Sequence, residues 1–312
     1  MTSLLMTFNT KALSKHAQRS IFYQRVLILY PFSFSQYSIM DAATILWLDG
    51  FLNSQDELKP LNLSNKTLKQ YVCRSLTQEN KGVTDMNTVH RIIHNQMVDE
   101  DETIEFKDTI KFIEAYKYLH KLSKDENGGL LENNILYDVH KLLMNHHKSW
   151  CTVGKYSIQQ RIVEFQGQLH YYVESHFIDS QMQMLIDEYN RRWTIIKYEI
   201  RRKDSTKALS DLMQLSAWFV NTFLQIHPFS DGNGRSVQLL YTYILEAYGF
   251  PFPIPLFWTS DHELEDREKA YTNWCQLLWD ARMTGELLPL ENHMAQVLKK
   301  CCQEYEIHRM NK

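Results

Sequence analysis

The sequence predicts an almost entirely helical protein that carries one short β-hairpin. Apolar residues recur every three or four positions through most of the 312-residue chain, which is the period of an amphipathic helix. The exception lies between residues 162 and 173, where two β-prone runs flank Gln166-Gly167-Gln168. Two such runs around a glycine-containing turn are typical of a hairpin. Hydrophobic residues make up 44% of the chain, a normal share for a globular protein with a buried core.

The first fifty residues are set apart by their charge. Residues 1–50 form a basic, acid-poor extension in which no Asp or Glu precedes Asp41. Three interpretations stay open: an organellar targeting segment, an N-terminal membrane anchor, or an upstream extension before a functional start near Met40. A membrane anchor is disfavoured because Pro31, several serines and Asp41 interrupt the apolar run between residues 26 and 48.

The rest of the chain divides into N-terminal helices over residues 51–125 and a core domain with closing helices over residues 126–312. Helical spacing of apolar residues predicts each segment. Helices are expected over residues 103–122, 131–145, 261–283 and 290–308, in addition to two that flank residues 227–235. Asn127-Gly128-Gly129 predicts a turn, and Pro251, Pro253 and Pro255 predict a loop after the flanking helices.

A nine-residue string, residues 227–235, reads His-Pro-Phe-Ser-Asp-Gly-Asn-Gly-Arg. The apolar stripe of one helix ends at Ile226, and Pro228 breaks its pattern. A second stripe begins at Val237, so Arg235 falls in the first turn of the next helix. The string therefore occupies the loop of a helix–loop–helix pair.

This string collects side chains suited to a nucleotide polyphosphate and a divalent cation. His227 can act as a base near neutral pH, and Asp231 is a hard oxygen ligand suited to Mg²⁺. Gly232 and Gly234 allow a tight turn whose backbone N–H groups, at a helix N-terminus, attract anions. Arg235 offers a planar fork of donors that matches phosphate oxygens. The residue types thus predict a site that binds phosphate and removes a proton beside it.

The string resembles the signature of the Fic family, His-x-Phe-x-Asp/Glu-Gly-Asn-Gly-Arg-x-x-Arg, and matches it through Arg235. The resemblance implies an all-α, Fic-type helical domain that transfers a phosphate-containing group, most often AMP from ATP, to a hydroxyl of a target protein. ATP would be the co-substrate and Mg²⁺ the cofactor. By position, the resemblance implies that His227 deprotonates the hydroxyl, Phe229 anchors the loop and Asp231 binds Mg²⁺. It likewise implies that Gly232, Asn233 and Gly234 form an anion-binding turn. Arg235 would bind the β-phosphate.

One position departs from the family pattern. The second arginine of the signature falls at Gln238, which carries no charge. In the family that arginine contacts the terminal phosphate of the nucleotide. Gln238 is expected to contact the nucleotide as a neutral hydrogen-bond donor, which is about half as strong as a charged one. The departure leaves the identity of the nucleotide donor open, because some family members use UTP or CDP-choline.

A second resemblance lies upstream, where residues 75–80 read Ser-Leu-Thr-Gln-Glu-Asn. This stretch is similar to the family's inhibitory helix pattern, Ser/Thr-x-x-x-Glu-Gly/Asn, and precedes the core as in the subclass with an N-terminal inhibitory helix. The resemblance implies that Glu79 inhibits through Gln238 or Arg235, and that Ser75 orients the helix. In some relatives the same glutamate helps to remove AMP, so a reverse activity is also implied. From the residues alone, an ordinary helix end with Asn80 or Gly82 as its C-terminal cap is favoured, and the position of the motif before the core is what supports the inhibitory interpretation.

The predicted hairpin stands where the family has a flap that pairs with the target's backbone and places the hydroxyl over the histidine. The resemblance therefore implies that the first strand contacts the target, and strand addition of this kind needs an exposed edge. The strand residues concerned are Ile162, Val163, Glu164 and Phe165.

The resemblance to the Fic family therefore implies a protein adenylyltransferase that Glu79 inhibits. The partner would be a protein with an accessible Ser, Thr or Tyr hydroxyl. Two alternatives stay open: a transferase that uses another nucleotide donor, and a non-catalytic module that binds a nucleotide or a target. Relatives of this subclass often form dimers, so a homodimer is a further expectation.

Composition narrows the setting. The net charge of −3 gives no indication of nucleic-acid binding. The five cysteines are scattered without zinc spacing, which favours a reducing, intracellular compartment over a disulfide framework. His146 and His147 could suggest a metal site, but the pair is interpreted as part of a solvated loop.

Overall fold

The computed structural model describes residues 40–55, 65–77, 81–83, 85–94, 103–165, 167–201, 204–258 and 264–310. The described helices are α2 (Ala42–Gln55), α3 (Asn65–Thr77), α4 (Met86–Ile93), α5 (Ile104–Ser123), α6 (Asn133–Met144), α7 (Ile178–Arg201), α8 (Ser205–Ile226), α9 (Asn233–Tyr248), α10 (Leu264–Thr284) and α11 (Leu288–Met310). The remaining elements are the 3-10 turns η1 (Asn145–His147) and η2 (Ser175–Phe177) and the strands β1 (Ile162–Phe165) and β2 (Gln168–Tyr171). The expected fold class, all-α with one hairpin, is confirmed.

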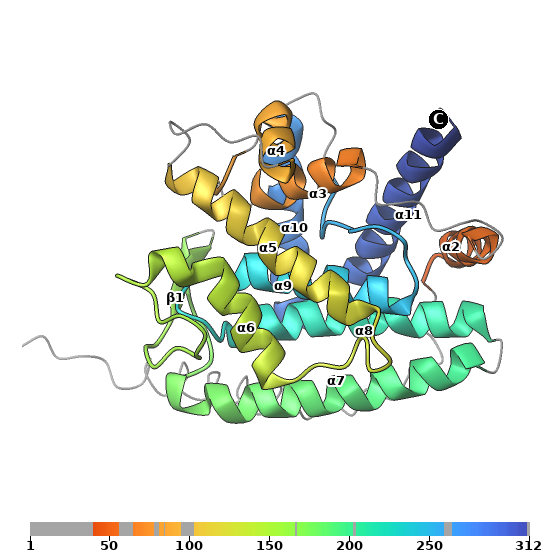
Figure 1. The fold of residues 1–312 in the computed structure, drawn as a ribbon. Helices are drawn as coiled ribbons and strands as arrows, with labels where there is room; N and C mark the ends of the chain where they lie inside the picture. Colours follow the sequence, from red (N-terminus) through yellow and green to blue (C-terminus); the bar gives the residue numbers. More distant parts are fainter. Residues whose placement is uncertain are drawn as a thin grey trace, which may run out of the picture. The chain divides into compact units, whose positions relative to one another are not determined.

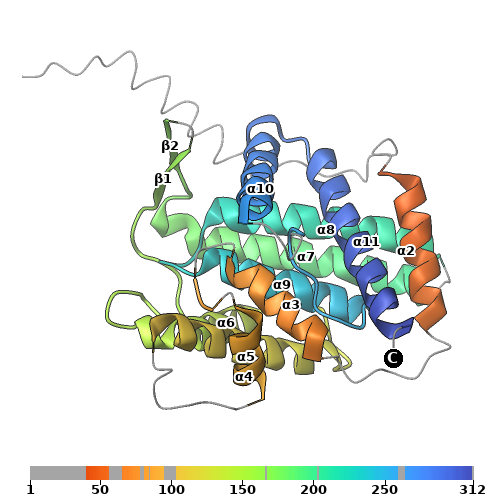
Figure 2. The same ribbon diagram turned by 90° about the horizontal axis from the view of Figure 1, so that it is seen from above.

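Helices α8 and α9 form the centre of the fold. α8 packs against α7 along its length and also contacts α2, α9, α10 and α11, whereas α9 contacts α3, α5 and α6 (Figures 1 and 2). Almost every residue of α9 between Arg235 and Glu246 is buried, because neighbours cover the helix on all sides. A helix that is covered all round presents its ends, rather than a face, to ligands.

The turn at residues 127–129 is confirmed, and it fixes α5 and α6 against this centre. Gly129 adopts φ +88°, and a Cβ atom there would lie 2.1 Å from the Trp193 ring. Its N–H donates to the Tyr243 hydroxyl on α9 at 2.9 Å, and its carbonyl accepts from the Tyr189 hydroxyl on α7 at 2.8 Å. Glycine is therefore required here, both by the backbone and by the aromatic ring above it.

α2 runs across the predicted boundary between residues 50 and 51. Its apolar residues Ile45, Leu48 and Phe51 are buried, and the helix packs against α8 and α11. Within the described residues, no helix combines the length and the apolar content that crossing a bilayer would require. The calls on residues 1–39, whether targeting segment, anchor or upstream extension, lie outside the described residues.

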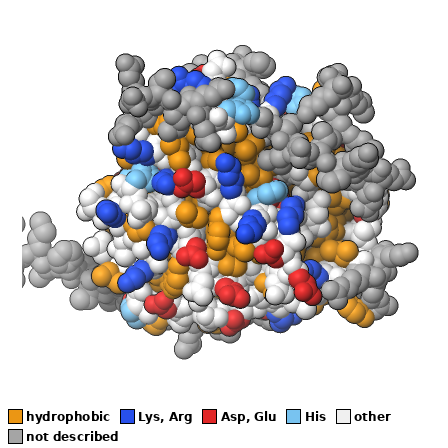
Figure 3. Space-filling model, viewed as in Figure 1, with side chains coloured by type: hydrophobic (Ala, Val, Ile, Leu, Met, Phe, Trp, Pro, Cys, Tyr) orange, Lys and Arg blue, Asp and Glu red, His pale blue; other side chains and the backbone are white. Residues whose placement is uncertain are grey.

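Charged side chains are mixed on the face seen in Figure 1. Figure 3 shows basic and acidic groups interspersed there, as a net charge of −3 would lead one to expect. On this face, the described residues form no single-signed patch of the kind that favours a nucleic-acid backbone.

Candidate active site

The nine-residue string connects α8 to α9, as expected. α8 ends at Ile226, and His227 follows in the left-handed region at φ 53°, ψ 58°, with its N–H on the carbonyl of Phe223 at 2.9 Å. Among the described residues, His227 is the one non-glycine residue with positive φ. That conformation costs a side-chain-bearing residue about 1–2 kcal/mol, so the surrounding contacts must impose it. The imidazole that follows this turn lies against Tyr172, the residue directly after the hairpin.

Phe229 anchors the loop, which confirms the expectation for this residue. Its side chain is fully buried and stacks on the His140 ring with centroids 3.9 Å apart and planes 4° apart. The Asn233 side chain holds the backbone on either side of it: Oδ1 accepts from Phe229 N–H and Nδ2 donates to the Phe229 carbonyl, both at 2.9 Å. Asn233 thus shapes the turn with its amide, and only its backbone remains to serve the anion-binding role expected of it.

The segment before the hairpin braces the same loop from outside. Ser157 N–H donates to the Pro228 carbonyl at 2.7 Å, and Thr152 N–H donates to the Ser230 hydroxyl at 3.1 Å. Gly154, which lies between them in the sequence, donates its N–H to Nδ1 of His140 at 3.0 Å. The neutral ring therefore carries its hydrogen on Nε2, which donates to the Asp231 carbonyl at 3.0 Å.

Burial keeps both histidines of this region neutral. It lowers the pKa of His140 to about 4, despite the favourable Asp231 carbonyl. Burial also lowers the pKa of His227 to about 4, and the positive charge of Arg161 acts in the same direction. At pH 7 the His227 imidazole is therefore unprotonated, which is the state that a general base needs.

Asp231 is the exposed acid of the loop. Its side chain is 35% exposed; Oδ1 accepts from Gly232 N–H at 2.7 Å, and Oδ2 lies 3.8 Å from Nη2 of Arg235. Gly232 adopts φ +73°, and a Cβ atom there would lie 2.9 Å from Sδ of Met144. α9 then begins at Asn233, so its first N–H groups follow directly after Asp231. An accessible carboxylate beside a helix N-terminus suits Mg²⁺ together with phosphate.

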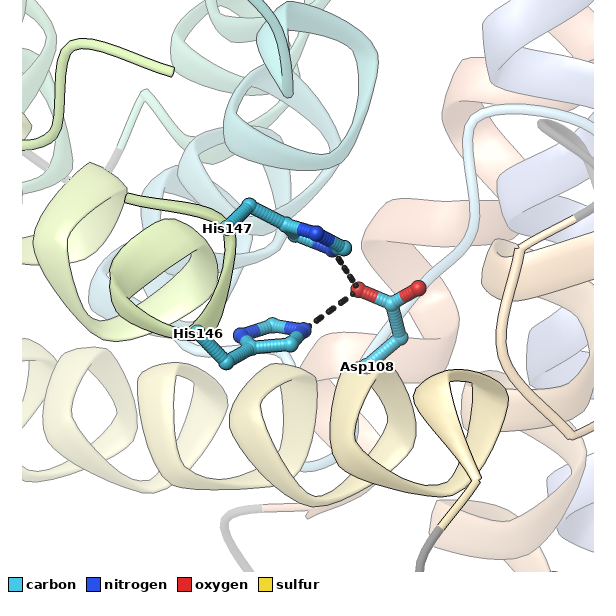
Figure 4. A group of neighbouring side chains, drawn as sticks. All are labelled: Asp108, His146 and His147. Atoms are coloured by element: carbon cyan, nitrogen blue, oxygen red, sulfur yellow. Dashed lines mark hydrogen bonds and ion pairs between the residues drawn. The ribbon is translucent and has the colours of Figure 1, made fainter. Parts of the chain in front are cut away.

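Arg235 lies deeper than its expected role predicts. Its side chain is 1% exposed, and Nη1 donates to Oδ1 of Asp108 on α5 at 3.0 Å. Asp108 is itself 3% exposed and receives two further contacts on the same oxygen, from Nε2 of His146 and Nε2 of His147, each at 2.8 Å (Figure 4). Burial favours a raised pKa for Asp108, but the bond from His147 and the charge of Arg235 outweigh it, and the pKa is lowered.

The interpretation of His146 and His147 as a solvated loop is wrong. His147 is buried, His146 is largely covered, and the carboxylate of Asp108, 38 and 39 positions away in the sequence, contacts both. The sequence contained one signal: Asp108 occupies the apolar stripe of its helix, four residues before Phe112 and eight before Tyr116. An acid on a buried helix face requires a partner, and the adjacent histidines provide it.

Both ends of the Gln238 side-chain amide form hydrogen bonds to the protein backbone. The side chain is fully buried; Nε2 donates to the Ile254 carbonyl at 3.1 Å and Oε1 accepts from Leu256 N–H at 2.9 Å. The residue therefore ties α9 to the proline-rich loop that follows it. Both ends of the amide are engaged by that loop, which differs from the nucleotide contact expected of this position.

The expected inhibitory residues are only partly described. Ser75 is buried on α3, a helix that packs against α5 and α9 and so lies beside the elements that carry Asp108 and Arg235. Glu79 lies outside the described residues.

The hairpin is confirmed, with β1 and β2 antiparallel and Ile162 opposite Tyr171. Ile162 is 51% exposed, and Val163 and Glu164 are also exposed, whereas the side chain of Phe165 lies outside the described residues. Directly after β2, the Tyr172 ring stacks on His227. The hairpin is therefore close to the histidine, as a substrate flap would need to be.

Comparison with known proteins shows which family this part of the chain resembles. Residues 130–245 match the Fic/DOC family. Over 106 residues, or 34% of this chain and 65% of the relative, the sequence is 34% identical to a Fido domain-containing protein of Dictyostelium discoideum. Over 166 residues it is 29% identical to the ribonucleoside-diphosphate reductase small chain of Ostreid herpesvirus 1, covering 46% of this chain and 28% of that protein. The chain thus spans less than two thirds of either relative.

Solved structures show the same fold. A Fic domain containing signaling protein from Bacteroides thetaiotaomicron superposes with a TM-score of 0.65 at 19% identity, over 83% of this chain and 92% of that one. Fic-1 (residues 134–508) from C. elegans gives 0.65 at 18% identity, over 98% and 79%. Proteins of this family are typically transferases. The Fic/DOC match covers the nine-residue loop, all of α8 and most of α9, so residues 130–245 resemble a Fic domain in sequence as well as in fold.

Proposed function

We propose that this chain is a protein adenylyltransferase, which moves AMP from ATP to a Ser, Thr or Tyr hydroxyl of a target protein. The observation that carries the proposal is the arrangement of one loop. An imidazole held neutral by burial, His227, stands at one end, and an accessible carboxylate, Asp231, stands beside a helix N-terminus at the other.

The proposed reaction needs one proton acceptor. The target hydroxyl oxygen attacks the α-phosphorus of ATP while its proton passes to the imidazole of His227. The new O–P bond forms as the bond from the α-phosphorus to the oxygen bridging to the β-phosphate breaks, and pyrophosphate leaves with that bond's electron pair. Transfer of this kind depends mainly on positioning and charge stabilisation, so few protein groups suffice.

The start of α9 would hold the phosphates. Its first N–H groups provide donors, the left-handed turn at Gly232 leads into them, and Gly234 adds no side chain that would keep a phosphate away. Arg235 already donates to Asp108 through Nη1, but a guanidinium has five N–H groups and can serve two anions. Asp231 would bind Mg²⁺, which would neutralise charge on the phosphates.

The hairpin would present the target. Its β1 strand carries the exposed Ile162, Val163 and Glu164, and an antiparallel pair leaves one edge of each strand available for backbone pairing. Tyr172 links the hairpin to His227, so a peptide added at this edge would pass near the base.

Regulation by the N-terminal helix is part of the proposal. We place Glu79 after α3 as the inhibitory acid, oriented by the helix that carries buried Ser75. Since the Gln238 amide is engaged by the proline-rich loop, Arg235 is the better partner for Glu79. A reverse reaction that removes AMP would use the same glutamate.

Two observations support a second candidate. Gln238 replaces a cationic phosphate ligand, and Arg235 is neutralised by a buried acid. Both reduce the positive charge that is available to bind a triphosphate. They therefore favour either a different nucleotide donor or a module that binds without transfer.

The deciding experiment is label transfer from α-phosphate-labelled ATP with Mg²⁺, in the Glu79→Gly protein and in a Glu79→Gly, His227→Ala blank. Label on protein that is absent from the blank supports the proposal. A nucleotide panel read by thermal shift accompanies it, because a ligand stabilises the fold in proportion to the logarithm of its occupancy. Stabilisation by UTP or CDP-choline without ATP transfer would indicate another donor. Nucleotide binding without any transfer would indicate a module that binds a nucleotide but does not catalyse transfer.

A further inference from the structure

A group of metal-ligating side chains lies outside the nine-residue loop. Asp108 comes from α5, and His146 and His147 come from η1, the turn that follows α6. One carboxylate oxygen and two imidazole nitrogens lie within 4.8 Å of one another in a buried setting. Figure 4 shows both rings directed at the same oxygen of Asp108.

We propose that Asp108, His146 and His147 bind a first-row transition-metal dication of the Zn²⁺ class. The site is separate from the carboxylate of Asp231, which the proposed function reserves for Mg²⁺, and the proposal does not depend on nucleotide transfer.

The ligand set selects the class of cation. Imidazole nitrogens suit zinc, copper, nickel and iron, whereas Mg²⁺ prefers oxygen ligands and keeps its waters. Two imidazoles and one carboxylate are the three protein ligands of many zinc sites that leave the fourth position to water. The chain offers all three from segments that the packing of α5 against α6 already brings together.

The cluster needs only a small adjustment to accept the ion. Each Nε2 now lies 2.8 Å from Oδ1 as a hydrogen-bonded pair. Ligand atoms around a tetrahedral Zn²⁺ are ~3.4 Å apart, given Zn–N and Zn–O bonds of ~2.1 Å. Each N–O distance therefore needs to lengthen by roughly 0.6 Å for coordination, and the two imidazole nitrogens already lie within 4.8 Å of one another.

Arg235 limits how tightly the ion is held. Its Nη1 lies 3.0 Å from the same Asp108 oxygen. A carboxylate has two oxygens, so Asp108 can ligate the metal and still accept from the guanidinium, as ligating carboxylates commonly do. The guanidinium charge opposes a dication at this distance, and we therefore expect an exchangeable ion rather than a permanently bound one.

Metal titration of the whole chain tests the proposal. The protein, without a polyhistidine tag and treated with a chelator, is titrated with ZnCl₂ by calorimetry, and with Co²⁺ by visible absorption to report on the coordination geometry. The expected result is one equivalent of Zn²⁺, with MgCl₂ unable to compete. His146→Gln and His147→Gln each lower the affinity ~10-fold or more. Glutamine keeps an amide donor for Asp108, so the fold retains that contact while the imidazole ligand is lost.

A second histidine pair supplies the matched control. His90 lies on α4 and His94 is the C-cap residue of that helix, with ring centroids 4.3 Å apart, a spacing that can also attract metal ions. His94→Ala should leave the one-equivalent binding unchanged. The proposal is overturned if the wild-type chain shows no saturable Zn²⁺ binding, if both glutamine variants bind as the wild type does, or if binding is lost only in His94→Ala. Each of these outcomes would mean that the cluster holds Arg235 in place and does not bind a metal ion.

Discussion

The ring of Tyr172 lies flat on the imidazole of His227, with centroids 4.0 Å apart and planes 18° apart. Above the tyrosine, the guanidinium of Arg282 on α10 is 5.2 Å from the ring centroid. Three elements that are distant in the sequence therefore meet in one column over the proposed base. The column buries His227 without offering it a hydrogen-bonding group, which explains why burial dominates its lowered pKa.

Removal of the Tyr172 ring should raise the pKa of His227. In Tyr172→Ala the imidazole gains water, so its pKa should move from about 4 towards the ordinary value of 6.5. The shift is measurable by NMR titration of the ring protons, with His227→Gln used for assignment. Tyr172→Phe keeps the stacked ring and should titrate as the wild type does. An unchanged pKa in Tyr172→Ala would show that the tyrosine is not what keeps His227 dry.

Acid should destabilise the loop through His140. The folded pKa of about 4 lies below the ordinary value of 6.5, so the unfolded chain binds more protons in the window between them. Stability is therefore retained above pH 6.5 and lost as the pH falls towards 4, by roughly 3 kcal/mol at most for this one group. Urea unfolding at pH 7.0, 5.5 and 4.5 should show a shallower loss in His140→Gln than in the wild type. Equal losses in both proteins would assign the acid sensitivity to other groups.

Asn233→Ala should destabilise the protein by about 2 kcal/mol. The variant removes two hydrogen bonds to the buried backbone of Phe229, each of which contributes about 1 kcal/mol. Denaturant unfolding gives the value. Asn134, exposed on α6, provides the comparison, and Asn134→Ala should change stability by about 0.5 kcal/mol or less. Similar effects from both substitutions would contradict a structural role for the Asn233 amide.

Gly232 and Gly167 have nearly equal φ angles, so alanine substitutions at the two positions distinguish backbone strain from a steric clash of the added Cβ atom. Gly232 has φ +73° with Met144 close to the position of a Cβ atom, whereas Gly167 has φ +74° and nothing within 4 Å. Each substitution by alanine should cost about 1–2 kcal/mol from the left-handed backbone. Gly232→Ala should lose more, because Met144 must also move. Thermal unfolding of the two variants checks this, and a larger loss in Gly167→Ala would be the opposite of the expectation.

Local sequence patterns predicted the positions of most helices well. They could not predict which side chains of different helices contact one another. The apolar stripes ending at Ile226 and beginning at Val237 placed both central helices, since each stripe depends only on neighbours within the same helix. α7 was not delimited by the sequence analysis, although its buried residues Met182, Leu185, Ile186, Tyr189, Trp193 and Ile196 follow helical spacing.

The misjudged residues depend on partners far away in the sequence. Gln238 is fixed by Ile254 and Leu256 in a loop whose path the sequence did not reveal. His146 and His147 depend on Asp108, which belongs to a different helix. A short motif can predict the chemistry of a loop, but the groups that neutralise or occupy its side chains come from the packing of α5, α6 and α9.

The backbone hydrogen bonds that the segment before the hairpin makes to the nine-residue loop end at Ser157, five residues before β1 begins. The braces made by Thr152, Gly154 and Ser157 therefore belong to a segment distinct from the strands that would read a target. An engineer who wished to redirect the protein to a new partner could exchange residues 162–171 as a cassette. The hydrogen bonds that hold the nine-residue loop would stay in place. The segment proposed to select the target and the segment that supports the proposed chemistry would therefore be separable along this part of the chain.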